Sequence, residues 1–310
     1  MAERPEDQVI VLMAAPGKAV IDEAVLAEVI SAVAPFDPEL RWLDETGHEA
    51  CEVAFTPPPS SHYQARSLEE RLRGRLSGRP IDVAVLPLGG RRKRLLVADM
   101  DSTIIAQECI DELAAAAGKG AEVAAVTERA MRGEIPFREA LRQRVAHLEG
   151  LPETVVQDVI GKRICINPGA AVLVATMKAH GAKTALVSGG FAPFAAHVAE
   201  VLGFDVWHAN SLKVKDGHLT GEVSEPALGK DAKLEIMQAL AAEMGIGLDA
   251  VLAVGDGAND VEMVRAAGLG VAWHGKPVLR AVADARIDVC DLSALLFLQG
   301  YRTDEFVPGT

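Results

Sequence analysis

The sequence lacks the long apolar runs and the basic charge that mark several classes of protein. In its 310 residues, no uninterrupted apolar stretch approaches the roughly 20 residues that a membrane-spanning helix needs. Its 31 Lys and Arg residues are outnumbered by 44 Asp and Glu residues, which gives a formal net charge of -13. A chain this acidic is a poor candidate for binding nucleic-acid phosphates. We therefore expect neither a membrane protein nor a nucleic-acid-binding protein.

Cysteines are few, and no two of them form a C-x-x-C pair. They are far apart in the sequence, at Cys51, Cys109, Cys165 and Cys290. This spacing predicts reduced core residues rather than disulfides or a metal site, as is usual in the cytoplasm. The first residues, MAERPEDQ, include acidic side chains and show no secretory signal pattern. We therefore expect a cytoplasmic protein.

The length suits about two domains, and the pattern changes near residue 90. Before that point, short apolar runs predict strands at 9–15, 41–44, 51–56 and 82–88. Helical spacing of apolar residues predicts helices at 21–33 and 67–76. The order β-α-β-β-α-β is that of ferredoxin-like α+β modules, which include the ACT-like amino-acid-binding modules. Residues 1–90 show no catalytic cluster, so both a scaffold or homodimerising role and an amino-acid-sensing role remain open.

From residue 91 to 310 the pattern becomes one of buried strands followed by helices. Strands are predicted for five near-continuous apolar runs, at 94–99, 183–188, 250–256, 269–273 and 286–290. Such runs are typical of parallel strands covered on both faces. Helices are expected between them, including 192–203 and 231–245. The fold class is therefore α/β, a doubly wound Rossmann-like parallel sheet.

About 80 residues separate the first two of these strands, far more than one crossover needs. Helical patterns fill the gap at 108–117, 120–132, 137–149 and 153–163. We interpret the region from about 106 to 166 as an inserted helical cap. A hairpin is expected at 213–223, with a type I′ turn at Asp216-Gly217.

Acidic and small residues follow three of the predicted strands. The segments are Asp99-Met100-Asp101-Ser102-Thr103, Ser188-Gly189-Gly190 and Gly255-Asp256-Gly257-Ala258-Asn259-Asp260. In open α/β sheets, ligands bind outside the carboxyl ends of the strands. Clustered carboxylates cost several kcal/mol unless a cation neutralises them. Oxygen ligands without nearby Cys or His indicate a hard ion, and Mg²⁺ fits best.

Four motifs, DMDST, SGG, Gly229-Lys230 before a helix, and GDGAND, occur in this order and resemble those of the haloacid dehalogenase superfamily. Within it, residues 94 to about 295 look like the phosphoserine phosphatase family. The resemblance implies that Asp99 is the nucleophile and forms an aspartyl phosphate. Asp101 would protonate the leaving alkoxide and later deprotonate water. A carboxylate suits the first role because its acyl phosphate hydrolyses more easily than an alkyl phosphate.

The same resemblance implies the remaining site residues. The metal would be held by Asp99, by the backbone carbonyl of Asp101 and by Asp256, with Asp260 nearby and acting through water or Lys230. The phosphate would be bound by Ser188, Gly189, Gly190, Lys230 and Asn259. Lys230 stands at a predicted helix start, where a cation is unfavourable, and an anion beside it would explain its position.

In the predicted cap helix 137–149, Arg144 interrupts an apolar face formed by Phe137, Leu141 and Leu148. A buried ion pair within the cap would satisfy it, and so would a substrate carboxylate. The family places its carboxylate-binding arginine here.

The resemblance further implies that Glu108 binds the substrate ammonium group. By itself, Glu108 is also an ordinary acid in the first turn of a helix. Met131 and Phe137 match family positions that wall the pocket, and both could equally be core residues.

The resemblance implies a Mg²⁺-dependent phosphatase for a small molecule, phosphoserine, at the last step of serine biosynthesis. Another small-metabolite phosphatase or a phosphotransferase of the superfamily is the alternative, and an inactive amino-acid-binding regulator is a weaker one. A cation-pumping ATPase is excluded because Asp101 follows the nucleophile and no membrane span is present.

Overall fold

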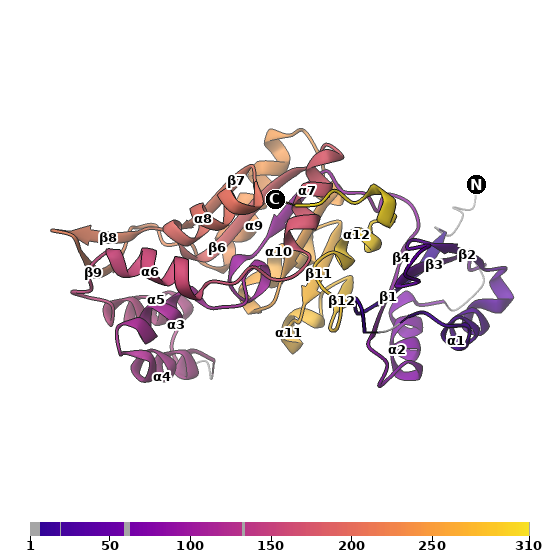
Figure 1. The fold of residues 1–310 in the computed structure, drawn as a ribbon, viewed down its shortest axis with the longest axis horizontal. Coiled ribbons are helices and arrows are strands. Elements are labelled where there is room, and N and C mark those ends of the chain that lie inside the picture. The colour runs from indigo at the N-terminus through magenta and orange to yellow at the C-terminus, as the bar shows by residue number, and fades with distance from the viewer. Residues whose placement is uncertain (1–6, 19, 59–62, 132–133, 310) are drawn as a thin grey trace.

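The computed structural model describes residues 7–18, 20–58, 63–131 and 134–309. The side chains of Met131, Phe137 and Lys230 also lie outside the description. The chain forms a four-stranded sheet, a six-stranded sheet and a separate hairpin. Figure 1 shows an elongated molecule, with the N-terminal sheet at one end and a group of helices at the other. Among the described helices, none combines the length and the apolar character that crossing a bilayer requires.

The N-terminal domain is an antiparallel sheet with two helices on one face. Its elements are β1 (Gln8–Ala14), α1 (Glu23–Val33), β2 (Glu39–Trp42), β3 (Ala50–Phe55), α2 (Ala65–Arg75) and β4 (Ile81–Pro87). The strand order β2-β3-β1-β4, with every pairing antiparallel, confirms the predicted ferredoxin-like topology. The strands alternate, so Ile10 and Leu12 pack with α1 and α2, whereas Val9 and Val11 point to the other face.

That other face of the N-terminal sheet is covered by the C-terminal part of the chain. Val9, Val11 and Leu86 share one apolar cluster with Leu295 and Leu298 of α12 (Ala294–Leu298). Figure 1 shows α12, in yellow, beside the indigo strands of the N-terminal domain. Strands β1 and β4 are therefore buried on both faces, whereas β2 at the edge is largely exposed.

The larger domain confirms the predicted parallel sheet. Its strands are β5 (Leu95–Ala98), β6 (Lys183–Phe191), β7 (Val206–Asn210), β10 (Val251–Gly255), β11 (Leu269–Trp273) and β12 (Ala285–Ile287). Their order is β12-β11-β10-β5-β6-β7, and all pairings are parallel. The chain moves from β5 outward to β6 and β7 and then returns to β10 on the opposite side of β5. The carboxyl ends of β5 and β10 thus flank the topological switch point, where such sheets bind ligands.

Helices cover both faces of this sheet. Leu96 and Ala98 pack with α7 and α8, whereas Leu95 and Val97 pack with α9 and α10. The bounds of these helices are α7 (Ala170–Ala179), α8 (Ala192–Leu202), α9 (Lys230–Glu243) and α10 (Val261–Ala266). A one-turn helix, α11 (Pro277–Arg280), follows β11. Because β5 is buried on both sides, its sequence is apolar throughout.

Four helices between β5 and β6 form the expected cap. They are α3 (Cys109–Ala116), α4 (Gly120–Met131), α5 (Phe137–Ala146) and α6 (Thr154–Arg163). An isolated bridge between Ile105 and Ile166 joins the two chain segments that lead into and out of these helices. The hairpin of β8 (Leu212–Lys215) and β9 (His218–Val223) packs against α5. Its turn has positive φ at Asp216 and Gly217, as the type I′ prediction requires.

Two expectations need correction. The last strand was expected to reach residue 290, but β12 ends at Ile287. The next three backbone N–H groups turn away from the sheet and donate to one carboxylate, that of Asp82 in β4, at 2.9–3.0 Å. Cys165 was expected in the core and is exposed, whereas the other three free cysteines are buried.

Asp82 is part of a polar junction between the two domains. Arg73 of α2 donates to Glu69 in its own helix and to the backbone carbonyl of Arg286, at 2.8 and 2.7 Å. It also lies 3.5 Å from the carboxylate of Asp288. Arg73 also lies 3.7 Å from the carboxylate of Asp82, which is 1% exposed. This junction fastens β4 to the chain that follows β12.

Candidate active site

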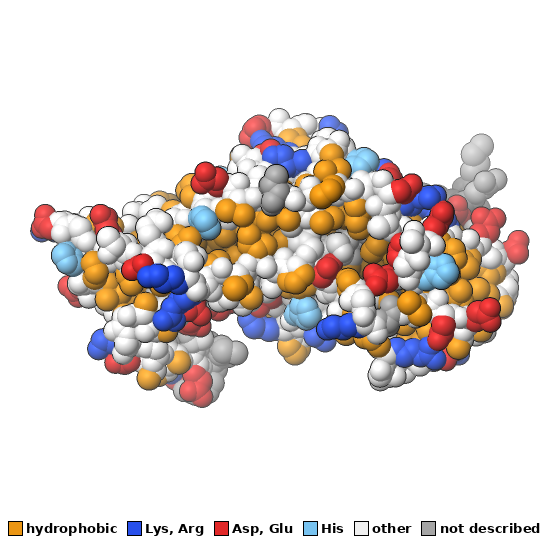
Figure 2. All heavy atoms as spheres, viewed as in Figure 1, with side chains coloured by type: hydrophobic (Ala, Val, Ile, Leu, Met, Phe, Trp, Pro, Cys, Tyr) orange, Lys and Arg blue, Asp and Glu red, His pale blue; other side chains and the backbone are white. Residues whose placement is uncertain are grey.

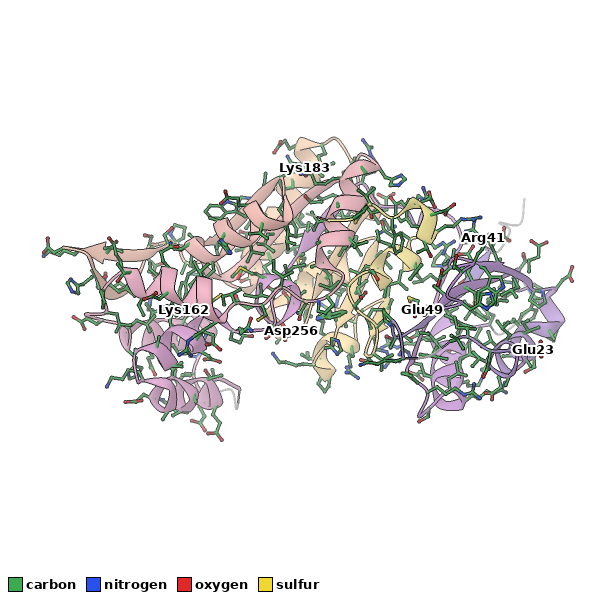
Figure 3. All side chains as sticks on the ribbon, in the orientation of Figure 1. Glu23, Arg41, Glu49, Lys162, Lys183 and Asp256 are labelled. Atoms are coloured by element: carbon green, nitrogen blue, oxygen red, sulfur yellow. The ribbon has the colours of Figure 1, made fainter. Side chains whose placement is uncertain are left out.

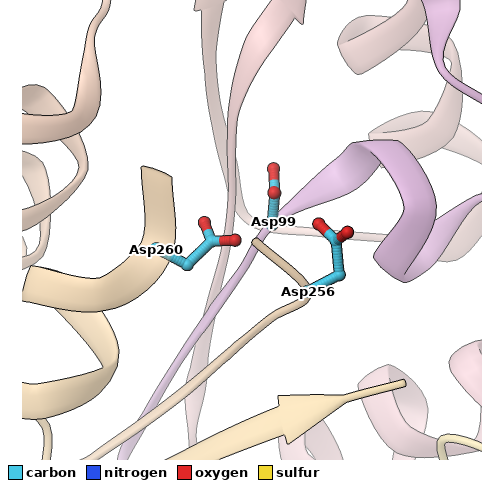
Figure 4. Close-up of side chains that lie close together, drawn as sticks. All are labelled: Asp99, Asp256 and Asp260. Atoms are coloured by element: carbon cyan, nitrogen blue, oxygen red, sulfur yellow. The ribbon is translucent and has the colours of Figure 1, made fainter. Parts of the chain in front are cut away.

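Three aspartates converge at the carboxyl edge of the parallel sheet. Asp99 follows β5 directly, Asp256 follows β10, and Asp260 closes the short turn after Asp256. One carboxylate oxygen of each lies within 4.8 Å of the others, and all three residues are buried. Figure 4 shows the three side chains directed into a common space between the two strand ends. The sequence predicted this convergence because neighbouring parallel strands end at the same edge of the sheet.

A lysine that the sequence analysis did not identify bridges two of these acids. Lys233 of α9 lies 2.6 Å from Oδ1 of Asp99 and 2.6 Å from Oδ1 of Asp260. The predicted residue, Lys230, begins the helix three residues earlier, and its side chain lies outside the described part of the chain. A sequence signal was present, since Lys233 shares a helix face with the buried Met237.

Burial and the neighbouring charges shift the pKa values of both Asp99 and Lys233. Burial, the charge of Asp260 and the charge of Asp101 raise the pKa of Asp99, and Lys233 opposes them, with a net result well above the ordinary value. Burial alone would lower the pKa of Lys233, but the charges of Asp260 and Asp99 outweigh burial and raise this pKa above its ordinary value. Without another cation, the cluster therefore holds more negative charge than a single ammonium group offsets.

Asp101 is held by two donors. Its Oδ1 accepts from the backbone N–H of Cys109 at 2.9 Å, and its Oδ2 accepts from the Ser188 hydroxyl at 2.8 Å. Ser188 in turn accepts from the N–H of Gly190 at 2.8 Å. A Cβ at Gly190 would collide with the Asp101 carboxylate, so only glycine allows this approach. The strand ends of β5 and β6 are thus linked through three of the predicted residues.

Two further side chains, those of Asn259 and Lys276, contact the aspartate cluster. The amide of Asn259, a predicted residue, donates to Oδ2 of Asp99 at 3.5 Å. Lys276, just before α11, lies 3.0 Å from Oδ2 of Asp256 and was not identified from the sequence. Burial would lower the pKa of Lys276, but the carboxylates of Asp256 and Glu108 outweigh it and raise the pKa.

These groups line a cavity of about 610 Å³ between the sheet and the cap. Figure 3 labels Asp256 near the middle of the molecule, between the cap helices and the N-terminal sheet. The predicted residues that line it are Asp99, Asp101, Glu108, Arg144, Gly189, Gly190, Asp256 and Asn259. Ser188 lies behind its wall, bonded to Asp101. The side chains of Met131 and Phe137, also predicted for the pocket, fall outside the described residues.

Arg144 enters the cavity from α5 without a carboxylate partner. Its Nε donates to the carbonyl of Ala140, at 3.4 Å. No carboxylate among the described residues lies within the 4 Å of an ion pair, so the ion pair within the cap that the sequence left open does not form there. Burial lowers the pKa of this guanidinium, although Asp111 and Glu108 oppose the effect from a distance. Its charge is left available to an anion in the cavity.

Glu108, just before α3, lines the same cavity as Arg144. Its Oε1 accepts from the Ser102 hydroxyl at 2.7 Å. Burial and the neighbouring charge of Asp101 raise the pKa of Glu108 to about 7. A cationic group bound beside it would favour its ionised form.

The donor set at the cavity floor fits a divalent cation with hard character. It consists of buried carboxylate oxygens within 4.8 Å of one another, without sulfur or imidazole. Both oxygens of Asp260 already have partners, Lys233 and the N–H of Gly257. Oδ2 of Asp99 has only a long contact, 3.5 Å to Asn259, and Asp256 contacts Lys276 through Oδ2, so Asp99 and Asp256 are the candidate ligands.

A comparison with protein families agrees with this geometry. The model described as haloacid dehalogenase-like hydrolase matches residues 96–265. That range begins in β5 and ends in α10, so it includes every strand end that contributes to the aspartate cluster.

Similar proteins cover different shares of the chain. Phosphoserine phosphatase SerB2 of Mycobacterium tuberculosis is 44% identical over 227 residues, 73% of this chain and 55% of that protein. The phosphoserine phosphatase of Streptococcus thermophilus is 46% identical over 200 residues, 64% of this chain and 93% of that protein. The chain thus spans about half of the longer relative and nearly all of the shorter one.

Solved structures extend the likeness to the N-terminal domain. The structure of a probable phosphoserine phosphatase from Vibrio cholerae has a TM-score of 0.74 at 32% identity. The match covers 97% of this chain and 88% of that one.

Proposed function

Since the chain belongs to the haloacid dehalogenase-like hydrolases and, within them, to the phosphoserine phosphatase family, we propose that it hydrolyses O-phospho-L-serine to L-serine and phosphate. One observation carries the proposal. A buried aspartate cluster lies in a cavity whose lining also includes Glu108 and Arg144, an arginine without a carboxylate partner among the described residues. This arrangement matches a small molecule with a phosphate, a carboxylate and an ammonium group.

We assign the nucleophile to Asp99. Its Oδ1 is fixed by Lys233 and by the N–H of Met100, at 2.6 and 2.7 Å. Its Oδ2 has only the 3.5 Å contact to Asn259 and is the freer oxygen. Attack by Oδ2 on phosphorus forms an aspartyl phosphate and breaks the bond from phosphorus to the serine oxygen. Lys233 holds the carboxylate in the attacking orientation.

We assign the proton transfers to Asp101. Its carboxyl group, held by Cys109 N–H and the Ser188 hydroxyl, lines the same cavity as Asp99. A proton on Asp101 passes to the departing serine oxygen, so that a neutral alcohol leaves. Asp101 then removes a proton from water as the water attacks phosphorus, which releases phosphate and restores Asp99.

We assign the metal, Mg²⁺, to Asp99, Asp256 and the backbone carbonyl of Asp101. When bound, it would supply positive charge that lets Asp99 remain ionised and that stabilises the transferring phosphoryl group. The raised pKa of Asp99 without it supports the need for such a charge. Lys230 remains a candidate phosphate ligand.

Substrate choice is assigned to the cap. Arg144 would bind the substrate carboxylate through its planar fork, and Glu108 would bind the ammonium group. The pathway that follows is the last step of serine biosynthesis, and a cytoplasmic location follows from it.

The test is a panel of phosphate monoesters assayed for phosphate release with and without Mg²⁺. We expect phosphoserine to have the highest kcat/KM and chelation of the metal to abolish turnover. Equal kcat/KM across monoesters that lack a carboxylate or an ammonium group would reject the substrate assignment. Transfer of the phosphoryl group to an added alcohol in preference to water would indicate a phosphotransferase instead.

A further inference from the structure

A second cavity, of about 370 Å³, lies between the N-terminal domain and the larger domain. Its walls come from α2 and β4 on one side and from α11 and β12 on the other, with the connection between the domains completing it. The lining shares no residue with the lining of the active-site cavity. Its volume falls in the range of small-ligand sites.

The charge of this cavity opposes that of the protein. Five cationic side chains line it, and only Glu69 and Asp284 are acidic. The five are Arg66, Arg91, Lys93, Arg280 and Arg286. Among the lining residues the cationic side chains outnumber the acidic ones by three, in a chain whose formal charge is -13. Lys and Arg side chains are visible along the lower edge of the molecule, around α11 and toward α2 (Figure 2).

Three of the five cations are already paired within the protein. Arg91 lies 2.8 Å from Glu52, Arg280 lies 2.8 Å from Asp288, and Arg286 lies 3.4 Å from Glu69. The pair of Arg286 with Glu69 joins the two domains, whereas that of Arg280 with Asp288 lies within the larger domain. The three pairs leave Lys93 and Arg66, which contact backbone carbonyls and have no close carboxylate partner among the described residues.

Lys93 is one of the two. It is 8% exposed, and its ammonium donates to two backbone carbonyls, those of Gly90 and Asp249, at 2.8 and 2.7 Å. An ammonium group has three donors, so one remains. No carboxylate among the described residues lies within ion-pair distance. Burial lowers the pKa of Lys93, and the charges of Asp249 and Asp284 oppose the effect without outweighing it.

Arg66 is the other, and it crosses the junction. It belongs to α2, and its Nη2 donates to the carbonyl of Arg280 at 3.3 Å. Among the described residues its acidic partner is Glu70, 3.9 Å away, and both side chains are more than half exposed. Such a pair is worth little in water. The guanidinium is therefore available at the cavity wall.

We propose that this interdomain cavity binds a small, doubly charged oxyanion, such as inorganic phosphate or a phosphorylated metabolite, through Arg66 and Lys93. The two residues come from different parts of the junction, so the anion would bridge them. Charge-assisted hydrogen bonds to an oxyanion are stronger than the neutral contacts that these groups now make.

The position of α11 connects this site with the active site. Lys276 and Val278 line the active-site cavity, whereas Arg280 lines the interdomain cavity. Lys276 contacts Asp256, and four residues later Arg280 provides the carbonyl that Arg66 contacts. An anion bound at Arg66 would therefore restrain the segment that carries Lys276.

The experiment is a titration of the full chain, in Mg²⁺, with sulfate, at constant ionic strength set with chloride. Hydrogen–deuterium exchange read by peptide separates the two sites. Anion binding in the interdomain cavity should slow exchange in 64–72 and 277–286, whereas binding beside Asp99 would slow exchange in 99–105. In Arg66→Gln and in Lys93→Met, the sulfate midpoint for the first two peptides should rise about tenfold.

Arg71→Gln is the matched control, because Arg71 is an exposed arginine of the same helix that does not line the cavity. The sulfate midpoint of Arg71→Gln should equal that of the unmodified chain. Acetate, with a single charge, should protect these peptides much less than sulfate does.

Protection confined to 99–105, or equal midpoints in Arg66→Gln and Arg71→Gln, would overturn the proposal. Arg66 is exposed, so its replacement should leave the fold intact. The readout does not involve turnover, so this proposal and the phosphatase assignment can fail separately.

Discussion

The ammonium group of Lys233 lies 2.6 Å from Oδ1 of Asp99, and both side chains are only 3% exposed. Asp260 accepts from the same ammonium group at 2.6 Å. One cation therefore holds two carboxylates in a space from which water is largely excluded, and Asp256 stands within 4.8 Å of both. The orientation of the proposed nucleophile depends on a helix that begins 131 residues after it in the chain.

Replacement of Lys233 by Met should affect both stability and turnover. Two buried carboxylates lose their shared cation, and breaking such a group costs about 3–5 kcal/mol. Urea unfolding without added Mg²⁺ should show a loss of this order, and kcat should fall by a factor of about 10² or more. Lys230→Met, at the start of the same helix, should change the free energy of unfolding by less than about 0.5 kcal/mol. A larger loss in Lys230→Met than in Lys233→Met would reverse the assignment of the anchoring lysine.

Asp99→Asn should abolish turnover while the fold remains intact. The amide cannot form the acyl phosphate, and losses on the order of 10⁴ or more in kcat are expected for a covalent nucleophile. Phosphate release measures activity, and the midpoint of thermal unfolding reports on the fold. Asp158→Asn, an exposed position paired with Lys162, serves as the control and should leave both unchanged. Near-normal turnover in Asp99→Asn would exclude the covalent route.

Arg144→Ala should raise KM for phosphoserine much more than KM for p-nitrophenyl phosphate, which has no carboxylate. A charge-assisted bidentate contact is worth about 1.5–3 kcal/mol, or roughly 10- to 100-fold in KM. Arg142→Ala lies on the same helix, where Arg142 is exposed and pairs with Glu225, and should change neither value. Equal losses on both substrates in Arg144→Ala would make this arginine structural.

The activity should depend on pH through Glu108. Its pKa is raised to about 7, so the carboxylate is increasingly protonated as the pH falls through 7 and can no longer pair with an ammonium group. KM for phosphoserine should therefore rise at low pH, whereas Glu108→Gln should have a high KM throughout. The substrate phosphate also titrates, at about pH 6. This titration changes KM equally in the unmodified protein and in Glu108→Gln, so it cancels in the ratio of the two KM values. A ratio of the two KM values that does not vary with pH would remove Glu108 from substrate binding.

Asp82→Ala should destabilise the whole protein, although Asp82 belongs to the N-terminal domain. The change leaves three backbone N–H groups after β12 without their acceptor and leaves Arg73 short of one counter-charge. We expect a loss of about 3 kcal/mol in urea unfolding. Asp158→Ala is the exposed control. Loss of stability confined to a separate N-terminal transition would show that the junction does not couple the domains.

Much of this architecture could be read from local patterns. The alternation of apolar runs and helical spacing predicted both sheets, because strand and helix periods differ and each buried face must be apolar. The convergence of Asp99, Asp101, Ser188 and Asp256 followed from the rule that parallel strands end at one edge. Arg144 was identified because a charge on an apolar helix face needs a partner.

Other features required the tertiary structure. The choice between Lys230 and Lys233 depends on how α9 is rotated against the sheet, and long-range packing sets that rotation. Lys276 contacts Asp256 only because the loop after β11 turns back across the edge of the sheet. The junction at Asp82 and the interdomain cavity each depend on segments about 200 residues apart in the sequence. Sequence periodicity reports which face of an element is buried, whereas the partner of a charged side chain is decided by the segments that packing brings beside it.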